Sequence, residues 1–279
     1  SGCGKSLTAL SIMDLLPKRA RRVARELTLL GEPIVGVSET TMADLRGNRM
    51  AMIFQEPMTS LNPAYTIGNQ LEEALLRHRK VSRAKARERA IHLLERVGIT
   101  AAEQRLRQYP HQLSGGLRQR VMIAMALMCE PKLLIADEPT TALDVTVQAQ
   151  ILRLRAQLQR DLGLGMLLIT HDLGIVARVA HKVAVMYAGK VVENAATAEL
   201  FASPRHPYTQ GLLRCVPVPG KIKRDEPLGS IPGTVPRVGP DFEGCAFRER
   251  CSFADATCTQ DIPRHQAGTT HDFLCRLPS

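Results

Sequence analysis

The sequence has few aromatic residues, because it contains no Trp, four Tyr and six Phe among 279 residues. Proteins that bind single-stranded nucleic acid usually combine basic grooves with aromatic side chains on which bases stack. The two basic segments, "KRARRVAR" (18–25) and "RHRKVSRAKARERA" (77–90), contain no aromatic residue. In the second segment, small and apolar residues alternate with the charges at helical spacing. The net charge of +10 therefore favours solvated helix faces over a surface that binds nucleic acid or an anionic membrane. We expect no nucleic acid partner.

Long apolar runs are also missing, since no stretch of 18 or more apolar residues occurs. Such a stretch is what a membrane-spanning helix requires, so none is expected. The chain starts with an apolar stretch followed by basic residues, which is the reverse order of a signal peptide. A hydrophobic content of 44% and a charged content of 23% are ordinary for a globular protein. We therefore expect a cytosolic protein of one large domain or two smaller ones.

Short apolar runs ending in polar residues alternate with helical stretches. The runs are "RMAMIFQ" (49–55), "KLLIADEP" (132–139) and "GMLLITHD" (165–172). This pattern is typical of buried parallel strands, and the alternation predicts an α/β fold. Ligands of such sheets lie at the carboxyl ends of the strands. Residues 56–112 start with turn formers and become a charged helical segment broken by Gly98 and Pro110.

The chain opens on "SGCGKS" (1–6), which fits the end of the phosphate-loop pattern G-x-x-x-x-G-K-[ST] and precedes a helical stretch. In such a loop, backbone N–H groups bind phosphate oxygens, Lys5 would reach the outer phosphates, and the Ser6 hydroxyl would bind Mg²⁺. Taken alone, the segment favours a phosphate loop, and a Gly-rich helix start without a ligand is the alternative.

Polar side chains end the three predicted strands. Asp137 would hold Mg²⁺ through its water shell, and Glu138 would polarise the attacking water. Two acids at a buried strand end are costly without a cation, which argues against a purely structural role. Gln55 and His171 follow the other two strands. Taken alone, each could also be a structural residue whose polar atoms are hydrogen-bonded within the fold.

A second anion-binding helix start lies in "LSGGLRQR" (113–120), where Ser114, Gly115 and Gly116 open a helix. One nucleotide does not need two such loops in one chain. Two chains arranged head to tail would let each of these loops close over the nucleotide of the other.

Together these motifs resemble the ATP-binding subunit of an ABC transporter. They follow the order of that family, with "TALD" (141–144) between the paired acids and His171. The resemblance implies a P-loop NTPase fold of the ABC type over residues 1–202. That fold consists of a RecA-like core and a helical subdomain over about 56–130, and an irregular extension (203–279) with a four-Cys cluster follows.

The resemblance also implies a role for each matching position. The expected catalytic residues are Glu138 as general base, His171 as switch residue and Gln55 as sensor of the γ-phosphate. ATP would be contacted by Ser1, Gly2, Cys3, Gly4, Lys5, Ser6, Gln55, Ser114, Gly115, Gly116, Asp137 and Asp144. Asp144 would be the acid at the dimer contact. Mg²⁺ would be held by Ser6, Gln55 and Asp137.

Three further segments are similar to the ATPases of bacterial oligopeptide, dipeptide and nickel importers: "EPMTSLNP" (56–63), "SPRHPYTQGLL" (203–213) and "IPGTVPRVGPDFEGCAFRERC" (231–251). This implies a subunit on the cytoplasmic face of the bacterial inner membrane that powers peptide import. Its partners would be permease subunits, a second identical or related ATPase subunit and, indirectly, a solute-binding protein. Import of nickel or another small solute is the alternative. Soluble ABC proteins of DNA repair or the ribosome usually carry coiled-coil insertions or tandem cassettes, and neither occurs here.

Four of the seven cysteines lie in the extension, as C-x5-C-x6-C-x16-C from Cys245 through Cys251 and Cys258 to Cys275. A reduced compartment argues against disulfides. The close C-x₂₋₄-C pair of most zinc sites is missing, and the wider spacing suits a [4Fe–4S] cluster better. The resemblance implies such a cluster too. Zinc, with His265 or His271 as a substitute ligand, and unliganded thiols are the alternatives.

The first Gly of the phosphate-loop pattern would lie two positions before Ser1, and the strand that precedes such a loop would lie further upstream. We therefore expect residues 1–279 to belong to a longer chain, which would bind ATP more tightly when extended upstream. A fragment without ATPase activity is the alternative. The aromatic residue that usually stacks on adenine would also lie upstream.

Overall fold

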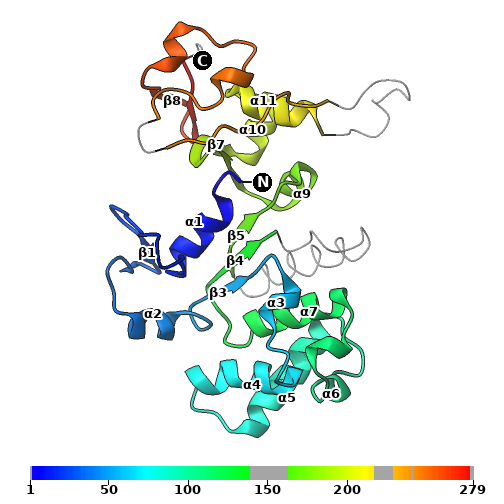
Figure 1. Ribbon diagram of the computed structural model, residues 1–279. Coiled ribbons are helices and arrows are strands. Elements are labelled where there is room, and N and C mark those ends of the chain that lie inside the picture. The colour runs from blue at the N-terminus through cyan, green and yellow to red at the C-terminus, as the bar shows by residue number, and fades with distance from the viewer. Residues whose placement is uncertain (1, 139–162, 217–228, 240–241, 277–279) are drawn as a thin grey trace, which may run out of the picture. The chain divides into compact units, whose positions relative to one another are not determined.

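The computed structural model describes residues 2–138, 163–216, 229–239 and 242–276. They form two compact units, and Figure 1 shows the elements of each. The first unit is Ser6–Thr170, and the second combines Ser1–Lys5 with His171–Ser279. No helix among these described residues is both long enough and apolar enough to cross a membrane.

The first unit contains a three-stranded parallel sheet of β3 (Met50–Ile53), β4 (Leu133–Asp137) and β5 (Gly165–Ile169), with β4 in the centre. In register, Met50 lies opposite Leu133, and Leu133 lies opposite Gly165. The prediction of parallel strands in these three apolar runs is confirmed. The parallel pairing brings the polar residues that end the strands to one edge of the sheet.

Both faces of this sheet are covered, which explains why its strands are apolar up to the polar residues near their carboxyl ends. On one face, Met50, Ile135 and Ile169 pack with residues of α1 (Lys5–Ile12) and α2 (Glu39–Leu45). On the other, Ala51, Leu134 and their neighbours join a larger core built by helices. A short antiparallel hairpin, β1 (Thr28–Leu29) with β2 (Glu32–Pro33), lies between α1 and α2 in the chain.

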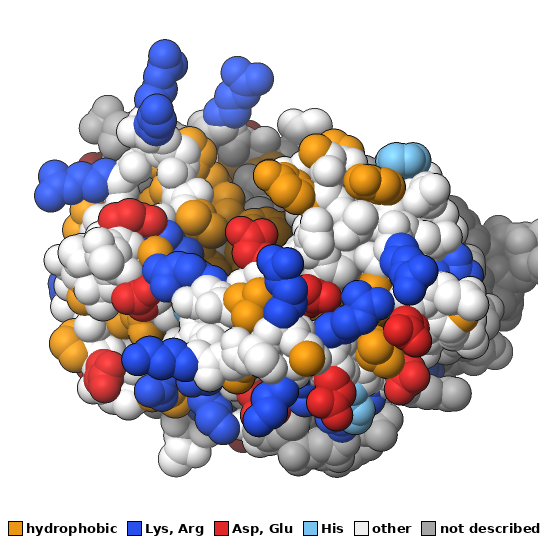
Figure 2. Space-filling view, turned by 90° about the horizontal axis from the view of Figure 1, so that it is seen from below, with side chains coloured by type: hydrophobic (Ala, Val, Ile, Leu, Met, Phe, Trp, Pro, Cys, Tyr) orange, Lys and Arg blue, Asp and Glu red, His pale blue; other side chains and the backbone are white. Residues whose placement is uncertain are grey.

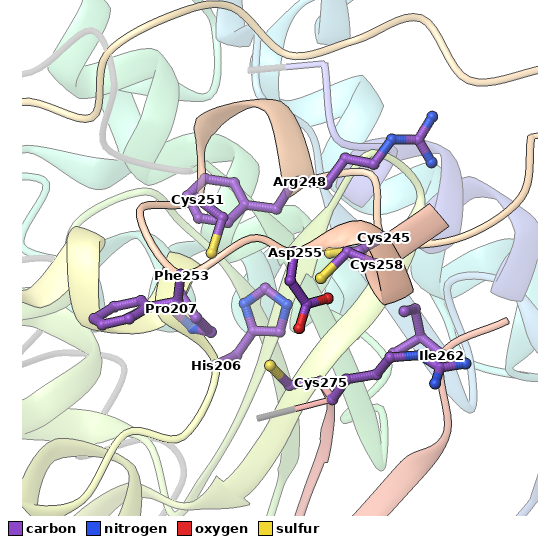
Figure 3. Close-up of a pocket in the computed structure, with 12 residues that line it drawn as sticks. His206, Pro207, Cys245, Arg248, Cys251, Phe253, Asp255, Cys258, Ile262 and Cys275 are labelled. Carbon is purple, nitrogen blue, oxygen red and sulfur yellow. The ribbon is translucent and has the colours of Figure 1, made fainter. Parts of the chain in front are cut away.

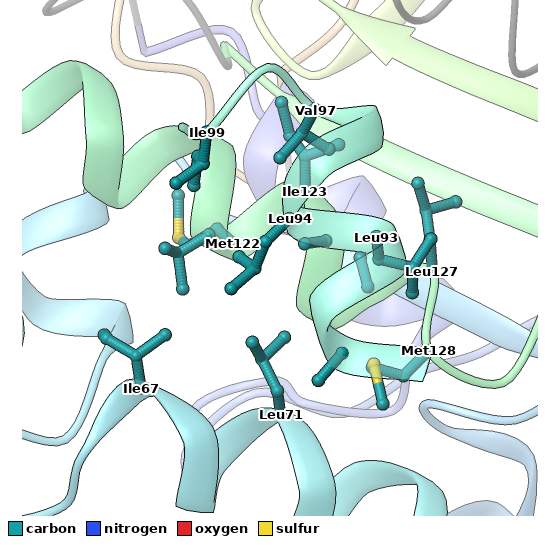
Figure 4. Packing of buried hydrophobic residues seen from close by; sticks show 14 of the residues in the cluster. Ile67, Leu71, Leu93, Leu94, Val97, Ile99, Met122, Ile123, Leu127 and Met128 are labelled. Carbon is teal, nitrogen blue, oxygen red and sulfur yellow. The ribbon is translucent and has the colours of Figure 1, made fainter. Parts of the chain in front are cut away.

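The larger core belongs to a run of helices, and Figure 4 shows its packed side chains. The helices are α3 (Pro57–Ser60), α4 (Ile67–His78), α5 (Arg83–Arg96), α6 (Ala102–Arg105) and α7 (Gly115–Ala126), with a 3₁₀ turn, η1 (Pro110–Gln112). Buried Leu71 of α4, Leu94 of α5 and Ile123 of α7 all contribute to this core. Burial of such side chains stabilises each by about 1.5–3 kcal/mol, so the three helices hold one another.

Helix starts in this region are set by hydroxyl caps. Thr66 accepts a hydrogen bond from the Asn69 N–H, and Ser82 accepts one from the Lys85 N–H. Such caps satisfy amide donors that have no partner inside a helix. Gly68 permits a close approach at the start of α4, because its N–H donates to the Leu106 carbonyl at 2.8 Å. A Cβ at that position would lie 2.9 Å from the same oxygen.

Opposite charges are interspersed on the face of the molecule shown in Figure 2. Several arginines of the helical region form ion pairs with acids, such as Arg89 with Glu130 at 2.9 Å. Arg87 lies 3.8 Å from Glu72 and 3.6 Å from Glu103. The basic segment 77–90 therefore lies on helices whose arginines alternate with carboxylates, as the helical spacing of its charges predicts.

The second unit is built on an antiparallel sheet with the strand order β6-β7-β9-β8. The strands are β6 (Lys182–Tyr187), β7 (Lys190–Ala196), β8 (Arg264–Ala267) and β9 (His271–Leu274). Its helical elements are α9 (Leu173–Val179), α10 (Thr197–Ala202), α11 (Pro207–Arg214), η2 (Arg248–Arg250) and η3 (Ala256–Thr259). Strand β9 pairs with β7 through Glu193 opposite Phe273, so residues about 80 positions apart in the chain lie side by side in this sheet.

The extension shares a core with the residues that precede it. Phe247 is buried with Tyr187 of β6 and Leu200 of α10, and its ring meets that of Tyr187 edge-on at 5.3 Å. The boundary expected between residues 202 and 203 falls inside this unit. The extension does not need the apolar periodicity of an independent domain, because its buried side chains pack against β6 and α10.

Candidate functional site

The carboxyl edge of the parallel sheet carries the two adjacent acids. Asp137 is the last residue of β4 and is only 4% exposed, while Glu138 directly follows it and is half-buried. Gln55 follows β3 and is exposed; its Nε2 donates a hydrogen bond to Glu138 Oε2 at 3.4 Å. The structure thus brings together two of the three predicted catalytic side chains, from strands 83 residues apart in the chain.

Glu138 has an unusual backbone conformation, with a φ of 39°. Its N–H donates to the Ile169 carbonyl of β5 at 2.9 Å, which extends the sheet pairing by one residue and fixes this turn. Non-glycine residues in the left-handed region are uncommon, and such conformations cluster at functional sites. The consequence is that the Glu138 carboxylate leaves the strand in a defined direction at the sheet edge.

The phosphate loop turns through two glycines before α1 begins at Lys5. Gly2 and Gly4 have φ angles of 91° and 85°, which L-residues adopt only with strain. Between them, the buried Cys3 accepts a hydrogen bond at its carbonyl from the Gly189 N–H at 3.2 Å. The loop is therefore held against the turn between β6 and β7. Ser1, also predicted to contact phosphate, lies outside the described residues.

The second predicted anion-binding loop forms the start of α7. Ser114 caps this helix, because its hydroxyl accepts a hydrogen bond from the Leu117 N–H at 3.4 Å. Ser114 and Gly115 are exposed, while Gln119 one turn later is buried. The loop is braced by Arg118, whose Nε donates to the Pro110 carbonyl at 2.7 Å. An exposed helix start of this kind presents backbone N–H groups and a positive dipole end to solvent.

The two remaining predicted site residues follow β5 and β4 in the chain. His171 is exposed and follows β5 by two residues, next to Asp172, which caps α9 by accepting from the Ile175 N–H at 3.1 Å. Asp144, with the rest of "TALD", lies outside the described residues.

A separate cavity of about 120 Å³ in the second unit is lined by all four cysteines of the extension. Figure 3 shows the sulfur atoms of Cys245, Cys251, Cys258 and Cys275 around this cavity, together with the ring of His206. The Cys245 N–H donates to the Cys258 carbonyl at 2.8 Å, which ties two of the thiol segments together. None of the four is in a disulfide.

Two thiols of this cavity have a pKa above the ordinary value for cysteine. Burial raises the pKa of Cys245, and the nearby thiols of Cys258, Cys275 and Cys251 raise it further, although a hydrogen bond from the Phe247 backbone opposes this. Burial also raises the pKa of Cys251. Burial disfavours the charged thiolate, and nearby thiolates would repel it, so both effects favour the neutral thiol of Cys245.

The described residues do not form a ligand set for zinc or for an iron–sulfur cluster. Among the described residues, no three His, Cys, Asp or Glu side chains converge closely enough to hold one ion. The two histidines considered as zinc ligands have other contacts. His271 Nε2 lies 2.7 Å from Glu193 Oε1, and the His265 ring stacks on Phe273 with centroids 5.6 Å apart.

A buried polar cluster around Glu193 was not predicted from the sequence. The Glu193 carboxylate is fully buried and accepts hydrogen bonds from the Arg205 N–H at 2.7 Å and the His206 N–H at 3.0 Å, in addition to its contact with His271. This joins β7, β9 and the segment before α11. The sequence feature that could have indicated this cluster is the acid Glu193 within the strand "KVVENAA". An acid is costly to bury unless it is paired.

His206 is also buried and connects this cluster to the cysteine cavity, which it lines. Its Nδ1 accepts a hydrogen bond from the Tyr208 N–H at 3.0 Å, and this caps α11. Burial lowers the pKa of His206 to about 4, although Glu193 opposes the shift. The ring is therefore neutral at pH 7, with its proton on Nε2.

Comparisons with known proteins agree with these features. A family described as ABC transporter matches residues 1–141, and one described as Oligopeptide/dipeptide transporter, C-terminal region, matches residues 192–258. The chain is 53% identical over 264 residues to the probable peptide ABC transporter ATP-binding protein y4tR of Sinorhizobium fredii, covering 94% of this chain and 78% of the relative. It is 51% identical to the dipeptide transport ATP-binding protein DppD of Escherichia coli, covering 94% and 80%.

Solved structures give the same result for the fold. The dimeric post-hydrolysis state of the ATP-binding cassette MJ0796, bound to ADP and Pi, is 25% identical and has a TM-score of 0.62 over 70% of this chain and 81% of that one. The cbiO1 structure from Clostridium perfringens, part of the transporter complex cbiONQ, is 28% identical with a TM-score of 0.59, covering 73% and 76%.

The parallel sheet with paired acids at its edge, the phosphate loop and the second helix start define an ATPase domain of the P-loop class. The chain belongs to the ABC transporter family and carries, after its ATPase domain, the C-terminal region of the oligopeptide/dipeptide transporters. ATP and Mg²⁺ are the general requirements of this family, whose ATPase subunits dimerise and work with membrane permeases.

Proposed function

We propose that this chain hydrolyses ATP to power the import of peptides through a bacterial ABC transporter. The match of residues 192–258 to the oligopeptide/dipeptide C-terminal region is the observation that supports peptides as the substrate class. The ATPase motifs do not distinguish substrates, because they are common to the whole family. The names of the y4tR and DppD relatives refer to peptide and dipeptide transport, which supports the same class.

In this proposal, each site residue acts on ATP through its own chemistry. Lys5 and Ser6 bind the outer phosphates and Mg²⁺, which neutralises charge on the phosphates. Asp137 holds the Mg²⁺ water shell and Glu138 accepts a proton from the attacking water. The Gln55 side-chain amide donates a hydrogen bond to Glu138, so the residue proposed to sense the γ-phosphate also contacts the general base.

The same proposal assigns roles at the dimer contact. Ser114, Gly115 and Gly116 of one subunit would close over the phosphates bound by the other, since an exposed helix start has donors available for a phosphate outside its own chain. Asp144 would lie at the dimer contact, and His171 would act on the γ-phosphate.

We propose that the permease contact includes the segment that follows Gln55 in the chain. Tyr65 and Tyr109 are 54% and 39% exposed, and their segments are joined by the Ile67 N–H, which donates to the Gln108 carbonyl at 2.8 Å. Exposed aromatic residues on a fixed backbone are suited to a protein partner. Binding there would keep the chain at the cytoplasmic face of the inner membrane without a membrane span of its own.

Transport by the complete transporter in proteoliposomes, with its solute-binding protein outside, tests the substrate class. We expect ATP-dependent uptake of labelled di- or oligopeptides, and loss of uptake to background with Lys5→Ala, because the phosphate contact is removed. Lys80→Ala, at an exposed lysine of the helical region, is the matched control and should transport normally. Uptake of nickel without peptide uptake would contradict the peptide assignment.

We further propose that the four extension cysteines hold an iron–sulfur cluster. What supports this is the donor set, because four thiols line one cavity. A cluster suits more widely spaced thiolates, because each thiolate binds a different iron.

Protein purified without oxygen tests the cluster. We expect brown protein with about four iron and four sulfide ions per chain, as a [4Fe–4S] cluster contains. Cys258→Ser should lose most of the iron, because one thiolate ligand is removed. Cys129→Ser, at a buried cysteine of the first unit, should retain it. Colourless wild-type protein with one zinc ion would contradict the proposal.

A further inference from the structure

The second unit has an open pocket of about 560 Å³ that shares no lining residue with the cysteine cavity. Part of its lining comes from the end of α10 and the segment after it, with Glu199, Ser203 and Arg205. The rest comes from the β8–β9 hairpin, with Gln266 and His271. Ligand pockets typically have volumes of about 300–1,000 Å³, so this pocket has room for a small organic molecule.

The imidazole of His271 is held in one orientation at this pocket. Its Nε2 lies 2.7 Å from Glu193 Oε1, and Glu193 is an acceptor, because its carboxylate also accepts two backbone N–H groups. Nε2 is therefore the donor in this contact. The pairing of β9 with β7 fixes both residues in the sheet. The other ring nitrogen, Nδ1, makes no hydrogen bond to any residue that the structure describes, so it has no competing partner inside the unit.

Opposite charges line the pocket without pairing with each other. The Arg205 side chain is partly buried and forms no hydrogen bond or ion pair with any described residue. Glu199 Oε2 accepts a hydrogen bond from the Thr270 hydroxyl at 2.7 Å, which orients this carboxylate. Charge-assisted hydrogen bonds are the strong ones, and Arg binds carboxylates with a planar fork of donors. The cation and the carboxylate are therefore each available to an opposite charge on a ligand.

We propose that this pocket binds a small zwitterion, with the ligand carboxylate at Arg205 and the ligand ammonium group at Glu199. Glu199 would repel a simple anion and Arg205 would repel a simple cation, whereas a molecule with both charges complements both residues. Free amino acids and short peptides have this chemistry. Ser203, Gln266 and His271 supply polar groups for the remaining hydrogen bonds of such a ligand. None of these residues belongs to the predicted ATP site, so the proposal does not depend on ATP hydrolysis.

Isothermal titration calorimetry of the full chain at low ionic strength, without ATP, tests the ligand class. The probes are dialanine, free alanine, and dialanine with its amine acetylated or its carboxylate amidated. We expect saturable binding of dialanine or of free alanine, with a Kd of about 1 mM or below. Each blocked form should bind at least about tenfold more weakly, because it lacks one charge-assisted bond. The tighter of the two free ligands shows whether the source is a peptide or an amino acid.

Two variants connect these preferences to the residues. Arg205→Met should lose the preference for the free carboxylate and keep the preference for the free amine, because only the cation is removed. Glu199→Gln should do the reverse. Arg237→Met and Glu249→Gln, at exposed positions of the extension, are the matched controls and should bind dialanine and alanine as the wild type does.

Several results would overturn the proposal. These are a wild-type chain that binds neither free ligand, blocked forms that bind as tightly as the free ligand, and pocket variants that keep both wild-type preferences. If Arg205→Met does not fold, as judged by hydrogen exchange of the β9 amides, Glu199→Gln decides, because Glu199 is exposed. All of these results leave ATP hydrolysis and peptide transport to their own assays, since binding is measured without ATP.

Discussion

Replacement of Glu138 by Gln is expected to slow ATP hydrolysis by about 10²–10⁴-fold while ATP still binds. The amide has the shape of the carboxylate, and its oxygen can still accept the hydrogen bond from Gln55, so the sheet edge should keep its geometry. What is lost is the ability to accept a proton from water. The measurement is phosphate release and nucleotide affinity in the assembled transporter.

Glu88→Gln is the matched control, because Glu88 is an exposed acid on α5. It should hydrolyse ATP at the wild-type rate. A Glu138→Gln variant that retains more than about a tenth of wild-type turnover would show that another group is the base, since a general base contributes at least about 10²-fold. Loss of ATP binding in the same variant would instead show that Glu138 is needed for the fold of the site.

Replacement of Glu193 by Ala is expected to weaken the second unit by about 3–5 kcal/mol. Its carboxylate is the acceptor for two backbone N–H groups and contacts His271, and all of these would stay buried without it. An unsatisfied buried donor costs about 1–3 kcal/mol. Native-state hydrogen exchange of the β7 and β9 amides measures the effect, because it reports the free energy of opening this unit alone.

Glu193→Gln should lose less, because it keeps one acceptor oxygen. Glu249→Ala, at an exposed acid of η2, should leave exchange unchanged. Equal protection of β7 and β9 in Glu193→Ala and Glu249→Ala would show that the buried cluster adds nothing to stability.

The sheet of the first unit could be predicted from the sequence because each of its strands is specified by neighbouring residues in the chain. Each strand is a short apolar run with a polar residue at its end, so the positions of Gln55, Asp137 and Glu138 at one edge follow from parallel pairing alone. The start of α7 at Ser114 follows from the cap and the two glycines in the same way. The left-handed conformation of Glu138 could not be predicted, because it depends on the bond to Ile169 from another strand.

The second unit depends on contacts between distant residues. Glu193 and His271 are 78 residues apart, and their contact exists only because β9 pairs with β7. The spacing of the cysteines predicts a shared site, but it contains no information on Arg276 or His206 as its walls. Those depend on how the extension folds over β6 and β7, which no local pattern specifies.

The position of β9 between β7 and β8 has a consequence for synthesis of the protein. During translation, β7 is complete long before residues 271–274 leave the ribosome, and until then one of its edges has no partner. An open strand edge is a template for association with other chains. A chain cut or stalled before residue 271 would therefore contain a finished parallel sheet together with an open, aggregation-prone edge. Pairing of residues 271–274 with β7 thus protects the newly made chain from association through this edge.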